Sequence, residues 1–276
     1  MQIRKREPRR LKVNPLSLFL FVEIYLIIYY SYFIINKEIT MYNILIFDLD
    51  DTLTDDEANC REAFKLMIKE REKFFDELNF QRFRQIDKKT WDDRSKGLLI
   101  TPYEDDNEKK KEWLRTSRII KYYGENSITY DEAVRLNDVY IEGMKEHVVA
   151  QPGTFEVIKY LFDKGYRIVI ATNGPIIPLK EKLKKLKIEK FVHTVFSSEE
   201  VGHMKPHVLF YEGLLRKADI NSEDKVLCIG DNLETDIKGG IEHGMDTCWC
   251  NYNDEINEKY KITYEINKLT DLIEIL

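Results

Sequence analysis

Four short polar clusters contain the residue types that phosphoryl chemistry needs, and each stands where a predicted strand or helix begins or ends. They occupy residues 48–52, 172–174, 205–206 and 230–236. Each cluster alone is typical of a turn or a helix cap. Their joint occurrence, in this order and always at an element boundary, favours a single catalytic pocket.

The first cluster offers two carboxylates with different roles. Asp48 directly follows an apolar run, and a carboxylate there can attack phosphorus to give an aspartyl-phosphate. Asp50, two residues later, can protonate the leaving oxygen and then accept a proton from water, which contributes roughly 100- to 10,000-fold to a rate. These residues predict a two-step hydrolysis through a covalent intermediate.

Carboxylates repel a phosphate dianion, so the same pocket needs a cation. Mg²⁺ prefers oxygen ligands and keeps several waters. We expect Asp231, Asp48 and the backbone carbonyl of Asp50 to supply oxygens, while Asp236 holds a coordinating water or orients Lys205. The predicted metal site therefore comprises Asp48, Asp50, Asp231 and Asp236, with Mg²⁺ as the cofactor.

The remaining clusters could anchor the phosphate. Thr172 can donate its hydroxyl, and the amides of Asn173 and Gly174 can form an anion-binding turn. Lys205 supplies a positive charge for the phosphate and the transition state. Pro206 is placed to open a helix whose N-terminus favours anions.

An alternation of strands and helices is predicted to position these residues. Continuous apolar runs typical of buried parallel strands cover residues 43–47, 166–171, 191–196, 226–229 and 247–250. Predicted helices cover residues 154–163, 178–187, 206–217 and 233–243, with Thr154 as the cap of the first. The pattern predicts a doubly wound parallel α/β sheet with Asp48, Thr172 and Asp231 at the carboxyl ends of strands.

A helical block interrupts this alternation. Residues 57–75, 80–94, 108–123 and 130–147 have helical patterns, and no strand pattern occurs in residues 55–148. We therefore predict a catalytic core of residues 41–55 and 149–276, with a helical cap at residues 56–148.

Composition narrows the class of partner. A formal net charge of −6 argues against a general nucleic-acid binder, whereas a small phosphorylated substrate remains compatible with a locally positive pocket. The four cysteines lack zinc-type spacing and are predicted to be reduced thiols in a cytoplasmic protein.

Residues 1–40 differ from the rest of the chain. A basic stretch at residues 4–12 precedes an apolar stretch at residues 16–35, which is long enough to cross a bilayer as a signal anchor. Met41, immediately before the first predicted strand, is the alternative start of translation. We expect a cytoplasmic enzyme, with membrane anchoring as the alternative.

With its four clusters in this order, the chain resembles the haloacid dehalogenase superfamily of hydrolases over about residues 41–276. The helical block resembles the cap that this family inserts after its first motif. The resemblance implies roles at matching positions: Asp48 as nucleophile, Asp50 as acid/base, Thr172 as phosphate ligand, Lys205 as stabilising charge, Asp231 as magnesium ligand and Asp236 as its support.

Segments 197–202, 235–240 and 247–249 resemble the branch that includes 5′-nucleotidases of pyrimidine and non-standard nucleoside monophosphates. The expected substrate is thus a nucleoside monophosphate. Four aromatic residues of the helical block could stack on a base, although such residues are more often core: Trp91, Tyr103, Trp113 and Tyr123.

Other activities share parts of this pattern. A sugar-phosphate or phosphoglycolate phosphatase would use the same residues, and a phosphomutase differs only in the acceptor. A 2-haloacid dehalogenase also uses an aspartate nucleophile but needs neither a leaving-group acid nor Mg²⁺. A non-catalytic binding module is disfavoured because the catalytic set is intact.

Overall fold

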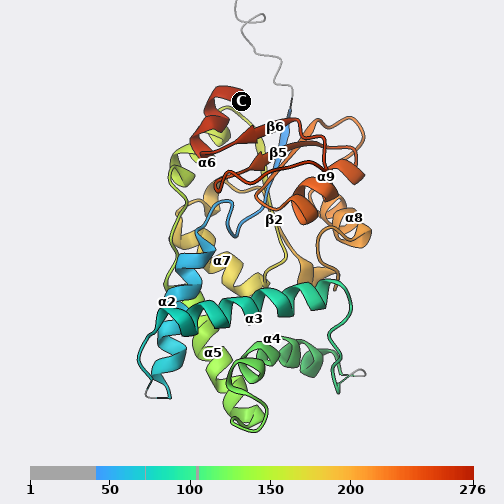
Figure 1. The fold of residues 1–276 in the computed structure, drawn as a ribbon. Helices are drawn as coiled ribbons and strands as arrows, with labels where there is room; N and C mark the ends of the chain where they lie inside the picture. The colour runs from blue at the N-terminus through green and yellow to red at the C-terminus, as the bar shows by residue number, and fades with distance from the viewer. Residues whose placement is uncertain (1–41, 72, 104–105) are drawn as a thin grey trace, which may run out of the picture. The chain divides into compact units, whose positions relative to one another are not determined.

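The computed structural model describes residues 42–71, 73–103 and 106–276. These residues include one β-sheet flanked by helices (Figure 1). Within them, six parallel strands form this sheet in the order β3-β2-β1-β4-β5-β6. The strands are β1 (Ile44–Phe47), β2 (Arg167–Thr172), β3 (Thr194–Ser197), β4 (Val226–Gly230), β5 (Asp246–Cys250) and β6 (Tyr264–Ile266). The predicted doubly wound parallel sheet is confirmed, and β6 is an addition to the predicted strands.

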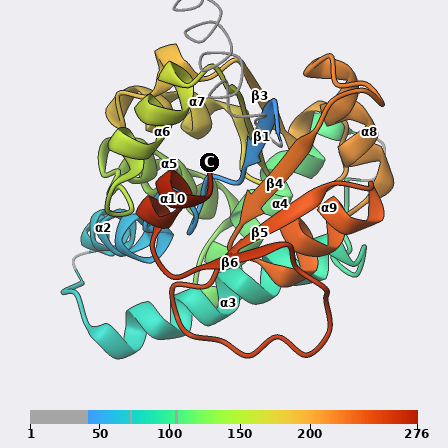
Figure 2. The same ribbon diagram turned by 90° about the horizontal axis from the view of Figure 1, so that it is seen from above.

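Helices cover both faces of the sheet (Figure 2). One face carries α6 (Thr154–Asp163), α7 (Ile176–Lys185) and α10 (Leu272–Ile275), and the other carries α8 (Val208–Lys217) and α9 (Lys238–Glu242). Successive residues of β1 alternate between these layers: Leu45 and Phe47 pack on the first, Ile44 and Ile46 on the second. Burying each such side chain contributes about 1.5–3 kcal/mol, which explains the unbroken apolar strand.

Between β1 and β2 the chain forms a helical cap with its own apolar cluster. It consists of α2 (Asp56–Lys69), α3 (Glu77–Ser95), α4 (Asn107–Tyr123) and α5 (Tyr130–Glu146), which lie beyond one end of the sheet (Figure 1). Phe64 of α2 is at its centre and contacts Phe83 with ring centroids 5.0 Å apart. Gly143 lets α5 approach α2 closely, because a Cβ there would lie 2.8 Å from the Cα of Ala63.

The chain enters and leaves the cap at neighbouring points. Thr54 forms an antiparallel bridge with Ala150, and the amide of Asp55 donates to the carbonyl of Val149 at 2.9 Å. The amide of Val149 in turn donates to Asn59 Oδ1 at 2.6 Å. The two crossings between sheet and cap therefore run side by side.

Two predicted helix starts were wrong because other residues cap the helices. The helix expected from Pro206 begins at Val208, because His207 is its N-cap and accepts a hydrogen bond from the Leu209 amide. Gly153 rather than Thr154 is the N-cap of α6, and the Thr154 hydroxyl instead donates to the carbonyl of Leu53 at 2.9 Å.

Other differences concern short elements. The first cap helix ends at Lys69 rather than near residue 75. The helix expected at residues 233–243 is a π-helical turn, η3 (Leu233–Ile237), followed by α9. The short 3₁₀ turns are η1 (Glu189–Phe191), η2 (Ser198–Glu200) and η4 (Leu269–Asp271). Because η1 includes the first residue of the predicted third strand, β3 starts later than predicted, at Thr194.

All four cysteines of the chain lie in the described part and are buried free thiols. Within the described residues, none of the helices has the length and apolar character needed to span a bilayer. The stretch at residues 16–35, considered above as a signal anchor, lies outside the described residues.

Candidate active site

The carboxyl ends of three adjacent strands bring three polar residues together. Asp48 directly follows β1, Thr172 ends β2 and Asp231 directly follows β4. β1 lies between β2 and β4, so these residues leave the sheet at the same edge. One carboxylate oxygen from each of Asp48, Asp231 and Asp236 lies within 4.8 Å of the other two.

Lys205 stands among these acids with its ammonium group buried. Its Nζ donates to Asp48 Oδ1 at 2.5 Å, to Asp236 Oδ1 at 2.6 Å and to the Ala171 carbonyl at 2.9 Å. Burial alone would lower the pKa of Lys205, but the charges of Asp236 and Asp48 outweigh it and raise that pKa. Lys205 is therefore a fixed positive charge beside the Asp48 carboxylate.

One lysine does not balance the acids around it. Burial raises the pKa of Asp48 to about 8, although the neighbouring Lys205 opposes the shift. Burial also raises the pKa of Asp231 well above its usual range, and the charges of Asp48 and Asp236 add to this shift. Two acids that resist ionisation in a shared pocket mark a need for additional positive charge.

A divalent cation with a preference for oxygen fits this donor set. Asp48 and Asp231 each bring a carboxylate to the pocket, and Mg²⁺ binds such oxygens. Asp236 is already engaged, since its Oδ1 accepts from Lys205 and its Oδ2 accepts from the Asn232 amide at 3.2 Å. Asp236 therefore contacts Lys205 directly.

Thr52 and Trp249 hold Asp231 in place. The Thr52 hydroxyl donates to Asp231 Oδ1 at 2.9 Å and accepts from the Asp231 amide at 3.0 Å. The Trp249 indole donates to the Asp231 carbonyl at 2.7 Å. Thr52 lies in the first polar cluster, but only the pairing of β1 with β4 reveals its role.

Residues 172–174 form a turn that adjacent side chains fix in place. The Gly174 amide donates to Thr172 Oγ1 at 2.9 Å, which leaves the Thr172 hydroxyl hydrogen available to a phosphate oxygen. Asn173 Oδ1 accepts from the Lys205 amide at 2.7 Å. Ser197 and Ser198 donate to the carbonyls of Gly174 and Asn173 at 2.6 and 2.8 Å. Asn173 thereby links the turn of residues 172–174 to Lys205.

The Asp50 side chain faces this turn rather than the group of three acids. A Cβ built on Gly174 would lie 3.4 Å from Asp50 Oδ2 and 3.2 Å from Thr172 Oγ1. The other oxygen, Oδ1, accepts from Lys182 and from Thr54 at 3.3 Å. Among the described residues, the acids that could hold a metal together are Asp48, Asp231 and Asp236, and the Asp50 side chain predicted as a fourth member is not among them.

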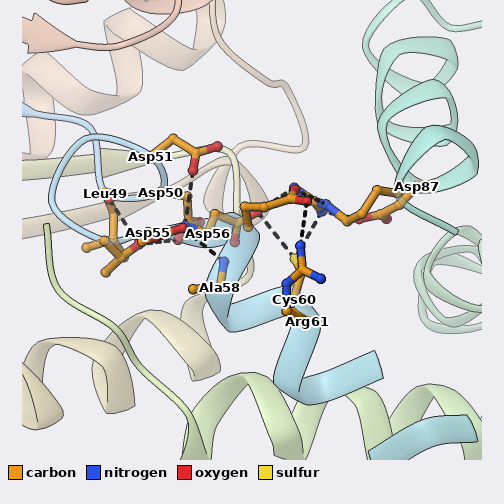
Figure 3. Close-up of polar contacts among 12 residues, drawn as sticks. Leu49, Asp50, Asp51, Asp55, Asp56, Ala58, Cys60, Arg61 and Asp87 are labelled. Carbon is orange, nitrogen blue, oxygen red and sulfur yellow. Dashed lines mark hydrogen bonds and ion pairs between the residues drawn. The ribbon is translucent and has the colours of Figure 1, made fainter. Parts of the chain in front are cut away.

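Polar contacts continue from Asp50 through Lys182 to Asp56 at the start of the cap. Figure 3 shows Asp50 and Asp56 in this group. Lys182 Nζ lies 3.8 Å from Asp56 Oδ1, and Asp56 Oδ2 accepts from Arg84 of α3 at 3.1 Å. Burial would lower the pKa of Lys182, but Asp50 and Asp56 raise it. Burial opposes ionisation of Asp56 as well, yet Lys182 and Arg84 lower its pKa. The Asp56 carboxylate therefore lies between two cationic side chains, those of Lys182 and Arg84.

Sequence reasoning missed Lys182, although a signal exists. Lys182 lies four residues after Pro178 and four before Leu186, so it falls on the apolar face of a lysine-rich helix. A lysine there must find a buried partner, because an unpaired ammonium in the core is costly.

A cleft joins the carboxyl end of the sheet to the cap. Its lining includes Asp48, Asp50 and Lys205 from the core and residues from α2 to α5. Of the four aromatic residues considered above for base stacking, the described lining contains Trp91, while Tyr103, Trp113 and Tyr123 lie elsewhere in the described cap.

The amino-acid sequence is similar to a known protein family and to named relatives. The family model for haloacid dehalogenase-like hydrolases matches residues 42–244. The pyrimidine 5′-nucleotidase PynA of Streptococcus pneumoniae is 28% identical over 85% of this chain and 95% of its own. The pyrimidine 5′-nucleotidase YjjG of Escherichia coli is 26% identical over 84% of this chain and 96% of its own.

A solved structure extends the likeness to the fold. The crystal structure of YfnB from Bacillus subtilis has a TM-score of 0.72 and 27% identity, and the match covers 85% of this chain and 98% of that one. That structure is described as bound to magnesium and as revealing interdomain movement.

Proposed function

Because the chain belongs to the haloacid dehalogenase-like hydrolase family, we propose that it is a magnesium-dependent phosphomonoesterase acting on nucleoside 5′-monophosphates. The observation that supports this most is the arrangement of two carboxylates. Asp48 is held by Lys205 beside Asp231, while Asp50 Oδ2 faces the turn of Thr172 and Gly174. These two environments support one carboxylate as the nucleophile and the other as the proton donor.

The first step transfers the phosphoryl group to the protein. An Asp48 oxygen attacks phosphorus while the bond from phosphorus to the ester oxygen breaks. A protonated Asp50 gives its proton to that oxygen, so the leaving group departs as an alcohol. Lys205 and the Thr172 hydroxyl stabilise the charge on the phosphoryl oxygens.

The second step restores the enzyme. Asp50, now ionised, takes a proton from water, and the water oxygen attacks phosphorus. The bond between phosphorus and Asp48 breaks, which releases inorganic phosphate and regenerates the carboxylate. Asp48 and Asp231 would hold Mg²⁺ here, which when bound would supply positive charge to offset the negative charge of the phosphate and of the carboxylates.

A dehalogenase would have no use for Asp50 in this position. Its nucleophile displaces a halide, which needs no proton, whereas an alkoxide leaving group does. The contact of Asp50 with Lys182 and its place beside Thr172 therefore favour phosphate esters. The names of PynA and YjjG favour nucleotides among those esters.

A phosphate-release screen of the full chain tests the substrate class. We expect the highest kcat/KM for nucleoside 5′-monophosphates in the presence of Mg²⁺, at least about tenfold above sugar phosphates and phosphoglycolate, which corresponds to roughly 1.4 kcal/mol of transition-state binding. A higher kcat/KM for a sugar phosphate or phosphoglycolate would contradict the nucleotidase proposal while leaving the phosphatase chemistry in place.

We propose that Trp91 of α3, which lines the cleft, contacts the base. Stacking of a base on an aromatic ring contributes about 1–3 kcal/mol, so Trp91→Ala should raise KM for a nucleoside monophosphate roughly 5- to 100-fold. Turnover of acetyl phosphate, which has no base, should change less than about twofold. Trp113→Ala, outside the cleft lining, is the matched control. Equal effects on both substrates would contradict a base contact.

A further inference from the structure

Lys182 is a charged residue that none of the four sequence clusters includes, yet it contacts the acid/base carboxylate. It comes from α7 of the core, and its side chain is 4% exposed. Its Nζ donates to Asp50 Oδ1 and lies 3.8 Å from Asp56 Oδ1. We propose that Lys182 is the positioning residue for Asp50. It holds one carboxylate oxygen so that the other faces the turn of residues 172–174. This inference rests on the phosphatase function proposed above.

The two oxygens of Asp50 have different surroundings. Oδ1 accepts from Lys182 and from the Thr54 hydroxyl, whereas Oδ2 lies beside Gly174 and Thr172. The terminal torsion of an aspartate is broad, so the side chain has no strong orientation of its own. A buried ammonium on one oxygen fixes that torsion and leaves the other oxygen directed at the leaving group. Proton transfer needs this hydrogen-bond geometry.

The neighbours of Lys182 keep it in position. Leu179 and Leu183, on the same helix, belong to the apolar cluster under the sheet. Asp56, the first residue of α2, offers Oδ1 toward Lys182 and receives Arg84 of α3 on Oδ2. Figure 3 shows Asp50 on the loop after β1, Asp56 where α2 begins and Asp87 across on α3. Lys182 thus joins the catalytic loop, a core helix and the start of the cap.

Arg84 completes the support from the cap side. It donates through Nη1 to Asp87 Oδ2 at 3.0 Å, and Asp87 Oδ1 accepts from Arg118 of α4 at 2.9 Å. Asp56 is therefore anchored to two further cap helices. Because a carboxylate shared between two buried cations cannot swing freely, Asp56 gives Lys182 a fixed second partner.

Kinetics of the full chain with two leaving groups test this role. Lys182→Met should lower kcat for a nucleoside monophosphate about 10- to 100-fold, within the range of a misplaced general acid. KM should change less than about threefold. The leaving group of 4-nitrophenyl phosphate needs little protonation. With this substrate, the rate constant of the burst of 4-nitrophenol release should stay within about threefold of the wild-type value. Lys182→Arg, which keeps a charged donor, should recover most of the lost kcat.

A double-mutant cycle distinguishes positioning from a general effect on the fold. In an Asp50→Asn background, Lys182→Met should cost less than about twofold, because its partner no longer transfers protons. Lys184→Met is the matched control, since Lys184 is on the same helix, exposed and paired with Glu181. It should behave as wild type. If Lys182→Met does not fold, Lys182→Gln takes its place in the cycle.

The outcomes separate two failures. Equal losses with and without Asp50, or for both leaving groups, would overturn the positioning role. If turnover of the wild-type chain depends on Asp48, wild-type kinetics of Lys182→Met would also overturn the positioning role. A wild-type chain without any phosphate release that depends on Asp48 would instead refute the phosphatase function, and this role with it.

Discussion

Replacing Asp48 with asparagine is expected to reduce phosphate release by at least about 10⁴-fold, as is typical when a covalent nucleophile is removed. An amide oxygen is a poor nucleophile toward phosphorus, and its position is otherwise nearly unchanged. The effect should appear with every phosphate ester that the wild-type chain hydrolyses. Phosphate release over hours, with the variant at high concentration, measures the residual rate.

The same substitution should not weaken the fold. Burial raises the pKa of Asp48 to about 8, above its value in an unfolded chain. An acid with a raised folded pKa opposes folding above its unfolded pKa, because the folded state holds the proton more tightly. An asparagine does not titrate, so the substitution removes this penalty at pH 7. In EDTA, the free energy of unfolding of Asp48→Asn should therefore be no lower than that of wild type.

Asp51→Asn is the matched control for position. Asp51 is adjacent to the site, and its Oδ1 accepts from the Asp56 amide at 3.0 Å, a bond that an asparagine oxygen can also accept. This variant should keep its rate within about fivefold, as expected for a group outside the reacting atoms. A residual rate of Asp48→Asn above about 1% of wild type would rule out Asp48 as the nucleophile.

Removal of divalent metal with EDTA should reduce turnover by at least about 10³-fold, and added Mg²⁺ should restore it, because a bound cation contributes several kcal/mol of charge stabilisation. Asp48 and Asp231 would otherwise face the phosphate dianion with Lys205 as their nearby positive charge. Mg²⁺ should also raise the unfolding temperature of the wild-type chain, since a ligand that binds only the folded state stabilises it.

Asp231→Asn should abolish that rise in unfolding temperature, whether or not the variant retains any activity. Glu234→Gln is the control, because Glu234 is an exposed acid three residues away, paired with Lys259. It should respond to Mg²⁺ as wild type does. Full turnover in EDTA, or an unchanged Mg²⁺ response of Asp231→Asn, would contradict the metal assignment.

The sequence predicted the elements that depend on local patterns. Apolar runs located β1, β2 and β4, because the central residues of strands buried on both faces are apolar. Parallel strands then bring Asp48, Thr172 and Asp231 to one edge without any knowledge of tertiary contacts. The family resemblance and the fold class are confirmed by the matching family model and by the six-stranded sheet.

What the sequence did not predict depends on partners that are distant along the chain. Lys182 and Asp50 are 132 residues apart, and no local pattern connects them. Thr154 resembles a helix cap, but its hydroxyl is used by Leu53, 101 residues earlier. The three residues of β6 are too few for periodicity to identify, and they are ordered by pairing with β5. Tertiary contacts decide each of these cases.

The paired crossings at Thr54 and Ala150 have an evolutionary consequence. An insert whose two ends lie next to each other can be lengthened, shortened or exchanged without rerouting the polypeptide that carries it. New specificity can then arise by grafting a different insert onto an unchanged reaction centre. A new insert would have to recreate contacts such as that of Asp56 with Lys182, because this contact connects the first helix of the insert to a helix of the catalytic core.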